Sequence, residues 1–287
     1  MPAAIDTNRI EAALRDDIGS WRGLVYADET GSTNDDVRTA QPAHLGLQGS
    51  WVMALADAQK NGRGRLGHGW FSPAGGAIHL SLAAELALST PLWPRASLVV
   101  GGAAARAISD VTGIDVRLKW PNDLLVSVDG TWRKAGGILC ERHEPARGPA
   151  LWICGIGVDV AIERSAFPTA LQDHVASLSW LAPAADRTEL ALALALAIRR
   201  DIEAWQARGG QLAVEELRKR AVFIGDIVTI DEGDGGAARD MRLVDLANDG
   251  GLIVQPPGGG PTENVAPLQI LAAQSNPPWH APPRLPR

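Results

Sequence analysis

The sequence has few cysteines, no long apolar run and no excess of positive charge. Of its 287 residues only two are cysteines, Cys140 and Cys154, which are too few for a disulfide framework. We expect both to be buried thiols that a reducing cytosol keeps reduced. If residues 140–154 form a hairpin centred on Arg147, the two thiols are equidistant from its turn and can face each other across the strands.

The longest apolar run, from Leu190 to Ile198, is far shorter than the ~18 residues of a membrane span. The first seventeen residues are acidic and show no signal-peptide pattern. A net charge of −6 argues against general nucleic-acid binding, so an anionic ligand requires a local cluster of positive charge. These features predict a cytoplasmic globular protein that contacts neither membranes nor DNA.

The stretch from Gln59 to Trp70 combines four glycines with Arg63, Arg65 and His68. Because glycine leaves the backbone few steric constraints, we expect a loop that is mobile when empty and closes on an anion. Trp70 can then cover a flat ligand such as adenine. A Gly-Arg-Gly tripeptide alone is more typical of a solvated basic turn, and it is the neighbouring motifs that favour an anion site.

Other polar motifs adjoin predicted strands and helices. Ser32, Thr33 and Asn34 suit either a helix cap or a polar site for a small uncharged ligand. Residues 122–123, an amide and a carboxylate after Pro121, suit either a turn or a site at a strand end. Lys134 precedes two glycines, which is compatible with a surface lysine or with close approach of a ligand.

Hydrophobic periodicity predicts an α+β fold whose mixed, mostly antiparallel sheet packs against helices. The predicted helices cover residues 7–17, 95–112, 188–209 and 212–220, and the predicted strands 24–26, 51–56, 77–86, 116–119, 124–128, 131–141 and 150–160. Beyond residue 221, short strands at 226–231, 238–246, 252–255 and 265–271 predict a small barrel. We therefore expect a catalytic domain over 1–221, a β-domain over 222–274, and a disordered tail over 275–287, which holds five prolines.

Five motifs occur in order: GSTN (31–34), QxxGRGRxGxxW (59–70), KWPND (119–123), KxGGIL (134–139) and GIGVD (155–159). In this order and spacing they resemble the biotin protein ligases, and the resemblance runs from about residue 26 to the C-terminal strands. It implies the catalytic fold shared with class II aminoacyl-tRNA synthetases, followed by an SH3-like barrel.

The resemblance also implies a reaction, that of a biotin–[biotin carboxyl-carrier protein] ligase. Biotin and MgATP give biotinyl-5′-adenylate and pyrophosphate, and a lysine of a carboxyl carrier domain of acetyl-CoA carboxylase or a related carboxylase then displaces AMP. About 30 residues precede the GSTN motif, whereas a winged-helix DNA-binding module needs about 60. We therefore expect a monofunctional enzyme without a DNA-binding domain, and exposed strand edges permit a homodimer without requiring one.

Each matching residue acquires an expected role from the resemblance. The expected catalytic residues are Lys134, Arg65 and Asp123; the biotin contacts Ser32, Thr33, Asn34, Gln59, Arg63, Arg65 and Gly136; the nucleotide contacts Arg63, Trp70, Asn122, Lys134 and Asp159; and the magnesium ligand Asp123. Arginine, lysine and Mg²⁺ together would offset the repulsion between the biotin carboxylate and the α-phosphate.

The sequence departs from the family pattern in three ways. Asp159 stands where relatives usually have asparagine, His68 where a basic residue is commoner, and no lysine or arginine occurs between Leu243 and Pro283. These departures bear on nucleotide affinity more than on reaction type. Two alternatives therefore stay open: a lipoate or octanoate ligase of the same superfamily, and a biotin-binding protein with impaired catalysis.

Overall fold

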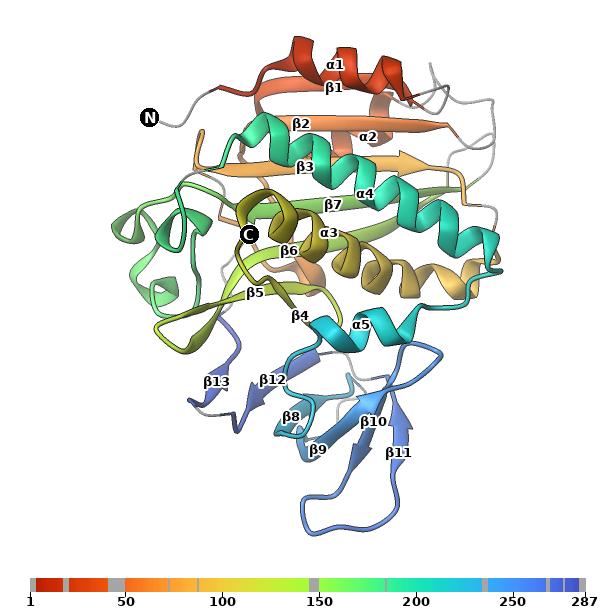
Figure 1. Ribbon diagram of the computed structural model, residues 1–287, viewed down its shortest axis with the longest axis vertical. Coiled ribbons are helices and arrows are strands. Elements are labelled where there is room, and N and C mark those ends of the chain that lie inside the picture. The colour runs from red at the N-terminus through yellow and green to blue at the C-terminus, as the bar shows by residue number, and fades with distance from the viewer. Residues whose placement is uncertain are drawn as a thin grey trace.

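A large mixed sheet and a smaller antiparallel sheet make up the protein (Figure 1). The computed structural model describes residues 4–17, 21–40, 50–71, 73–86, 88–144, 150–183, 185–233, 237–266, 269–275 and 277–283. Within these ranges no helix is both long enough and apolar enough to cross a membrane.

The large sheet has seven strands in the order β1-β2-β3-β7-β6-β5-β4. Its strands are β1 (Trp21–Thr30), β2 (Trp51–Gln59), β3 (Ala77–Ala84), β4 (Arg117–Lys119), β5 (Asp123–Val128), β6 (Thr131–His143) and β7 (Leu151–Asp159). Strands β1 and β2 are parallel, and every other neighbouring pair is antiparallel. The predicted mixed, mostly antiparallel sheet is thus confirmed, although β1 is longer than expected.

Helices pack on both faces of this sheet. They are α1 (Thr7–Asp16), α2 (Thr33–Ala40), α3 (Ala96–Thr112), α4 (Arg187–Ala207) and α5 (Val214–Arg220). Helices α3 and α4 cover one face (Figure 1). A Cβ at Gly101 of α3 would lie 2.6 Å from the Leu118 side chain, so a small residue is needed for this close packing. Helix α2 packs on the opposite face, where Val37 is buried against β2 and β3.

Local sequence signals specify several of the connections. Helix α3 ends at Gly113, which has a left-handed backbone with φ of 72°. Asp129 and Gly130 both have positive φ and form the two-residue turn between β5 and β6. Cys140 lies directly opposite Cys154 on β6 and β7, and both are free thiols, as predicted. Only Cys154 is buried, however, so the expected burial of Cys140 is wrong. Short 3-10 turns at 164–166, 169–171 and 178–180 follow β7.

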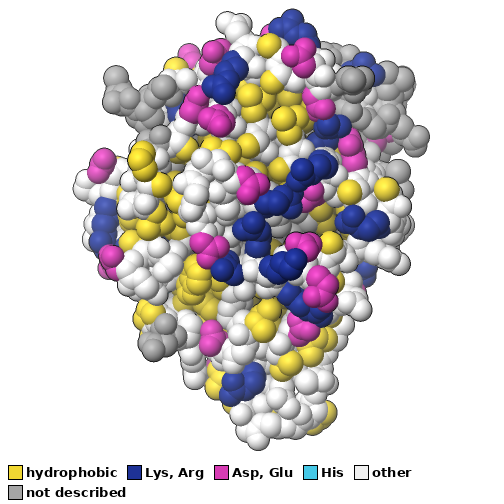
Figure 2. Space-filling model, in the orientation of Figure 1, with side chains coloured by type: hydrophobic (Ala, Val, Ile, Leu, Met, Phe, Trp, Pro, Cys, Tyr) yellow, Lys and Arg dark blue, Asp and Glu magenta, His cyan; other side chains and the backbone are white. Residues whose placement is uncertain are grey.

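The surface over α3, α4 and α5 mixes charges of both signs (Figure 2). Arg106 pairs with Asp201 at 2.9 Å, and Arg218 pairs with Asp245 at 2.6 Å. Both pairs are partly exposed, and ion pairs within reach of solvent contribute little stability. They make this face a solvated surface of mixed charge.

The smaller sheet has six antiparallel strands in the order β11-β10-β9-β8-β12-β13. They are β8 (Ile227–Asp231), β9 (Arg239–Leu246), β10 (Leu252–Gln255), β11 (Glu263–Val265), β12 (Gln269–Ala273) and β13 (Trp279–His280). The single strand expected over 265–271 is therefore wrong, because β11 and β12 are separate strands there. The disorder expected over 275–287 is also not what the described residues show, since β13 pairs with β12 and Trp279 is only 3% exposed.

Candidate active site

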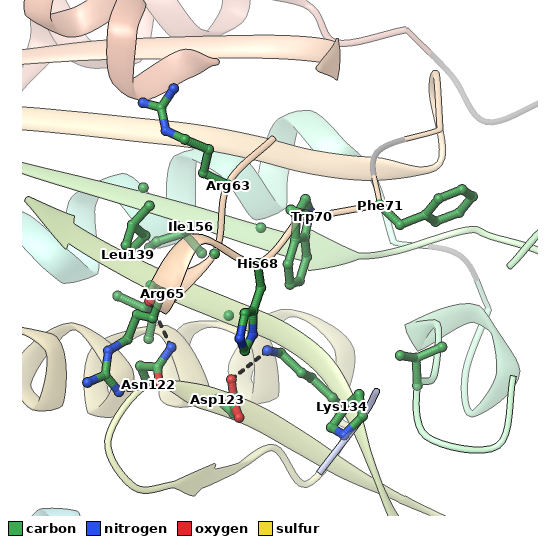
Figure 3. A pocket seen from close by; sticks show the side chains of 18 of the residues that line it. Arg63, Arg65, His68, Trp70, Phe71, Asn122, Asp123, Lys134, Leu139 and Ile156 are labelled. Carbon is green, nitrogen blue, oxygen red and sulfur yellow. Dashed lines mark hydrogen bonds and ion pairs between the residues drawn. The ribbon is translucent and has the colours of Figure 1, made fainter. Parts of the chain in front are cut away.

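A cavity lies on the face of the large sheet that α3 and α4 leave uncovered. Its walls come from the start of α2, the glycine loop after β2, the strands β4 to β7, and the segment 281–283 after β13. The elements that carry the five sequence motifs thus meet around one cavity (Figure 3).

Glycines on β6 and β7 allow side chains to lie directly on the sheet. A Cβ at Gly157 would lie 2.5 Å from the Trp70 ring, and a Cβ at Gly137 would lie 3.2 Å from the same ring. A Cβ at Gly155 would overlap Asn34. The two glycines of the GxG pattern therefore allow Asn34 and Trp70 to lie directly against the β7 backbone.

The end of the cavity near α2 is polar and carries a hydrogen-bond network. The Gln59 Oε1 accepts from the Thr33 backbone N–H at 2.9 Å and from its hydroxyl at 3.2 Å. Because its oxygen is held in this way, Gln59 has its NH₂ group available as a donor to a ligand.

Asn34 belongs to this network but uses its amide within the protein. Its Oδ1 accepts from the Ser81 hydroxyl at 2.6 Å, and its Nδ2 donates to Glu141 at 2.6 Å. Ser81 is fully buried and was not predicted as part of the site. The signal for it was a serine in a strand whose only other polar residue is His79, on the face that packs against α2.

The glycine loop forms a short hairpin that is tied to α2. Backbone hydrogen bonds join Gly64 to His68 at 2.8 Å and Trp70 to Gly62 at 2.9 Å. Arg63 donates to both oxygens of Asp35, at 2.7 and 2.8 Å, and these bonds hold the pKa of Asp35 below its usual range. The guanidinium of Arg63 therefore points away from Lys134, as Figure 3 shows.

Arg65, two residues later, points to the opposite end of the cavity. Its Nη1 donates to the Asn122 Oδ1 at 3.2 Å, and the Asn122 Nδ2 donates in turn to the Ile138 carbonyl at 3.0 Å. Burial lowers the pKa of Arg65, while the nearby Asp123 opposes this shift. The side chains of the two loop arginines therefore lie at opposite ends of the cavity.

Asp123 lies between two lysines at this positive end. Its Oδ1 is 2.6 Å from the Lys134 Nζ, and its Oδ2 is 2.7 Å from the Lys119 Nζ. Despite burial, which acts to raise it, the pKa of Asp123 is held well below the usual range by these two ammonium groups. The side chain of Lys119 is 4% exposed and that of Lys134 is 21% exposed, so Lys134 is the lysine that a ligand can reach.

Lys119 connects the cavity to the smaller sheet, a role that the sequence did not reveal. Its Nζ donates to the Ile270 carbonyl at 3.4 Å and lies 4.9 Å from the centre of the Trp279 ring. Burial lowers the pKa of Lys119, and the charge of Asp123 opposes this shift. The C-terminal sheet, which carries no lysine or arginine beyond Leu243, thus supplies a carbonyl and a ring to a cation of the large sheet.

Asp159, at the end of β7, is 4% exposed and lines the cavity. Its Oδ1 has no hydrogen-bond partner among the residues that the structure describes. Burial raises the pKa of Asp159 well above its usual value, against the opposing charge of Lys134. Burial at this position therefore favours the neutral form of the carboxyl group.

Of the residues predicted for the site, all but one line this cavity. The lining residues are Ser32, Thr33, Asn34, Gln59, Arg63, Arg65, Trp70, Asn122, Asp123, Lys134 and Asp159. Gly136 does not line it: a Cβ there would point at the Gly157 carbonyl and at Leu124, and Gly137 faces the cavity in its place.

The magnesium role expected for Asp123 does not fit this arrangement. Both of its oxygens are within 2.7 Å of a lysine ammonium group, which leaves them poorly placed to bind a cation. Across the described ranges, no group of three or more His, Cys, Asp or Glu side chains is placed to hold a metal ion.

Comparisons with known proteins agree with the geometry of the site. Residues 32–159 match the Biotin/lipoate A/B protein ligase family. The chain is 30% identical to the biotin–[acetyl-CoA-carboxylase] ligase of Mycobacterium tuberculosis over 244 residues, which span 80% of this chain and 86% of that protein. It is also 30% identical to the enzyme of the same name from Paracoccus denitrificans over 243 residues, 80% of this chain and 93% of that protein.

Among solved structures, the fold resembles the biotin protein ligase of Aquifex aeolicus in complex with biotin and ATP. The TM-score is 0.68 and the identity 23%, with 87% of this chain and 97% of that chain covered. The biotin protein ligase of Leishmania major in complex with biotinyl-5-AMP matches with a TM-score of 0.57 and 24% identity, covering 86% and 98%.

Proposed function

The chain belongs to the biotin protein ligases, and on this premise we propose how its cavity activates biotin with ATP and passes it to a carrier lysine. The observation that carries the proposal is the division of the cavity into a neutral polar end and a positive end. Biotin has the matching division, with an uncharged ureido ring at one end and a carboxylate at the other.

The polar end binds the ureido ring in this proposal. A ureido group needs a donor for its carbonyl and acceptors for its two N–H groups. The NH₂ group of Gln59 is the donor, and the Ser32 hydroxyl lies in the same wall. Asn34 and Ser81 act indirectly, by holding Thr33 and the neighbouring backbone in place.

The positive end brings two anions together. Lys134 and Arg65 offset the repulsion between the biotin carboxylate and the α-phosphate, so that a carboxylate oxygen can attack phosphorus and pyrophosphate can leave. A lysine amine of the carrier then attacks the acyl carbon of the mixed anhydride and AMP leaves. Mg²⁺, which would arrive with the triphosphate, supplies further neutralisation of phosphate charge when bound.

Asp123 acts in this proposal as a positioning residue for Lys134. Its lowered pKa makes it a weak base, so it is poorly suited to take the proton of the carrier amine. Its contact with Lys134 instead fixes where the ammonium group lies when the two substrates enter.

The finer assignments are proposals as well. The acceptor is the carrier domain of acetyl-CoA carboxylase, by analogy with the names of the two relatives. A boundary near residue 221 between a catalytic part and a β-domain is supported by the two sheets, although β13 extends the smaller sheet beyond the expected end at residue 274. A cytoplasmic location and a capacity to dimerise remain predictions from sequence.

A direct comparison of three acids tests the function. Purified protein with MgATP is given biotin, lipoate or octanoate, and acyl-adenylate formation is followed by exchange of labelled pyrophosphate into ATP. We expect exchange with biotin, and transfer to a carrier domain seen as a mass increase. Exchange with lipoate or octanoate but not with biotin would reject the proposal, as would biotin binding without any exchange.

A further inference from the structure

Asp159 is a buried acid, and its neighbours leave one of its carboxyl oxygens without a hydrogen bond. It lines the cavity at 4% exposure, and its buried Oδ1 meets no hydrogen-bond partner within the described part of the chain. A buried carboxyl group without partners is costly, and an ionised one is far more so. A polar atom left in this state and facing a cavity is suited to a ligand that supplies the missing hydrogen bond.

Asp159 and Trp70 lie along the same face of β7. Side chains alternate along a strand, so Asp159 projects on the same side as Gly157, whose Cα the Trp70 ring covers. The Lys134 Nζ lies 5.5 Å from the centre of the same ring. A flat ring that contacts Trp70 can therefore direct one edge toward Asp159 while attached phosphates meet Lys134.

We propose that Asp159 is protonated in the working enzyme and reads the adenine of ATP, donating its O–H to N1 and accepting from the 6-amino group. This inference rests on the proposed function. A protonated carboxyl group offers one donor beside one acceptor, which is the arrangement that the N1 and 6-amino edge of adenine requires. An ionised carboxylate offers acceptors alone, so it would face the N1 lone pair and repel the triphosphate.

The charges around Asp159 are compatible with its protonated form. Burial raises its pKa, and Lys134 on β6 opposes this. Lys134 is itself paired with Asp123 at 2.6 Å, which offsets part of its effect. On β3, burial lowers the pKa of His79 to about 4, so that ring is neutral near pH 7.

One further charged pair lies near the strand opposite Asp159. Arg187 donates at 3.4 Å to the carbonyl of Ala77, the β3 residue in register with Asp159. It is also paired with Asp57 at 2.8 Å, so its charge is largely balanced. Phosphate binding at Lys134 would reduce the remaining positive field and favour the proton on Asp159 further.

The first test uses the wild-type protein and an ATP analogue. In 1-deaza-ATP a C–H group replaces N1, so the buried proton of Asp159 would lose its acceptor. At about pH 6.5 and saturating biotin, we expect the KM for 1-deaza-ATP to exceed that for ATP by at least about tenfold. Equal KM values would overturn the inference, because a carboxylate that only accepts from the 6-amino group would not sense the change at N1.

The second test compares the pH dependence of wild type and Asp159→Asn, whose amide offers a donor and an acceptor at every pH. The KM for ATP in the wild type should rise with pH once Asp159 ionises, by up to about tenfold per pH unit, and should stay flat in the variant. A KM for ATP that rises with pH in Asp159→Asn as steeply as in the wild type would contradict the proposal, whereas two flat profiles from about pH 6 to about pH 9 are those of a proton retained throughout this range.

The third test observes the proton directly. In nucleotide-free protein with ¹³C-labelled aspartate, the carboxyl resonance that Asp159→Asn removes should show a protonated group at about pH 6.5. A resonance that titrates in the ordinary aspartate range would overturn the inference. Biotin-dependent adenylate formation in the same preparations tests the proposed function separately, since it can succeed whichever way these three tests turn out.

Discussion

Replacing Asp123 with asparagine should destabilise the protein because it leaves a buried lysine without its counter-charge. Lys119 is 4% exposed and has Asp123 at 2.7 Å, while its other contacts are a carbonyl and an aromatic ring. Lys134 loses the same partner, but it is 21% exposed and water can solvate it. The cost therefore falls mainly on Lys119.

The size of the effect follows from the burial. Removing one partner of a buried pair costs about 3–5 kcal/mol. A chain of this size has about 5–15 kcal/mol of total stability and loses about 2–4 °C in Tm per kcal/mol, so we expect a decrease of about 10 °C. The pH range over which stability rises should also move from the acid to the alkaline side, because Asp123 governs it in the wild type and Lys119 in the variant.

In the wild type, the lowered pKa of Asp123 gives stability that is present above about pH 4 and lost as the pH falls further. In Asp123→Asn, the unpaired Lys119 has its pKa lowered by burial with no opposing charge. The unfolded chain then binds more protons than the native state, so stability should rise with pH toward the ordinary lysine pKa of 10.5.

The assay is urea and thermal denaturation of four proteins: wild type, Asp123→Asn, Lys119→Met, and the double variant. Methionine has a similar length and no charge, so the double variant should recover at least half of the lost stability. Adenylate formation should stay low in the double variant, because Lys134 still lacks its positioning partner. An Asp123→Asn protein within about 1 kcal/mol of wild type, or a double variant no more stable than Asp123→Asn, would refute the reasoning.

Three further predictions concern single residues of the cavity. Lys134→Ala should lower pyrophosphate exchange by about a hundredfold or more with little change in Tm, since the side chain is partly exposed; near-normal exchange would contradict its role. Arg65→Gly should let biotinyl-adenylate escape, seen as biotin on bystander proteins, whereas Arg63→Gly is the matched control, because Arg63 is bonded to Asp35; labelling confined to the carrier in both would argue against retention by Arg65. Asp159→Asn should stabilise the protein by an amount that grows as pH rises above about 4, because the native state holds a proton that the unfolded chain releases; a constant difference in unfolding free energy from about pH 5 to about pH 8 would exclude a raised pKa.

Local signals were sufficient for the elements that depend on neighbouring residues. Helix α3 ends at Gly113 as predicted, and the two-residue turn at Asp129 and Gly130 is also as predicted. In both cases the residues that adopt the left-handed backbone are themselves the sequence signal. Proline content misled the prediction for the C-terminal segment. Trp279 is held there by pairing with β12 and by contact with Lys119, and neither partner is a sequence neighbour.

The side of a strand on which a residue lies could not be predicted where the strand is irregular. Lys134 and Gly137 are three residues apart, so they should face opposite sides of a regular strand. The pairing of β5 with β6 shifts between Leu124 and Leu125, which are opposite Gly136 and Lys134 respectively, and leaves Ala135 as an extra residue. This bulge brings Lys134 and Gly137 to the same cavity and turns Gly136 away.

The motifs likewise identified residues that line the cavity but not their partners. Arg63 and Arg65 are separated by one glycine and looked equivalent, yet one bonds to Asp35 and the other to Asn122. The partners lie 28 and 57 positions away in sequence, so only the fold distinguishes the two arginines.

The positive end of the cavity must be stable before any anion enters it. Lys119, Lys134 and Arg65 are close enough to disfavour one another's charge, and burial adds to this cost for Lys119 and Arg65. Asp123 reduces that cost, and with it the cluster keeps a net charge of two positive units, which matches a carboxylate and an α-phosphate each carrying one negative charge. When these anions arrive, one lysine has to contact them. Lys119 is enclosed by the C-terminal sheet, so that lysine is Lys134, whose ammonium group has protons for both Asp123 and the ligand.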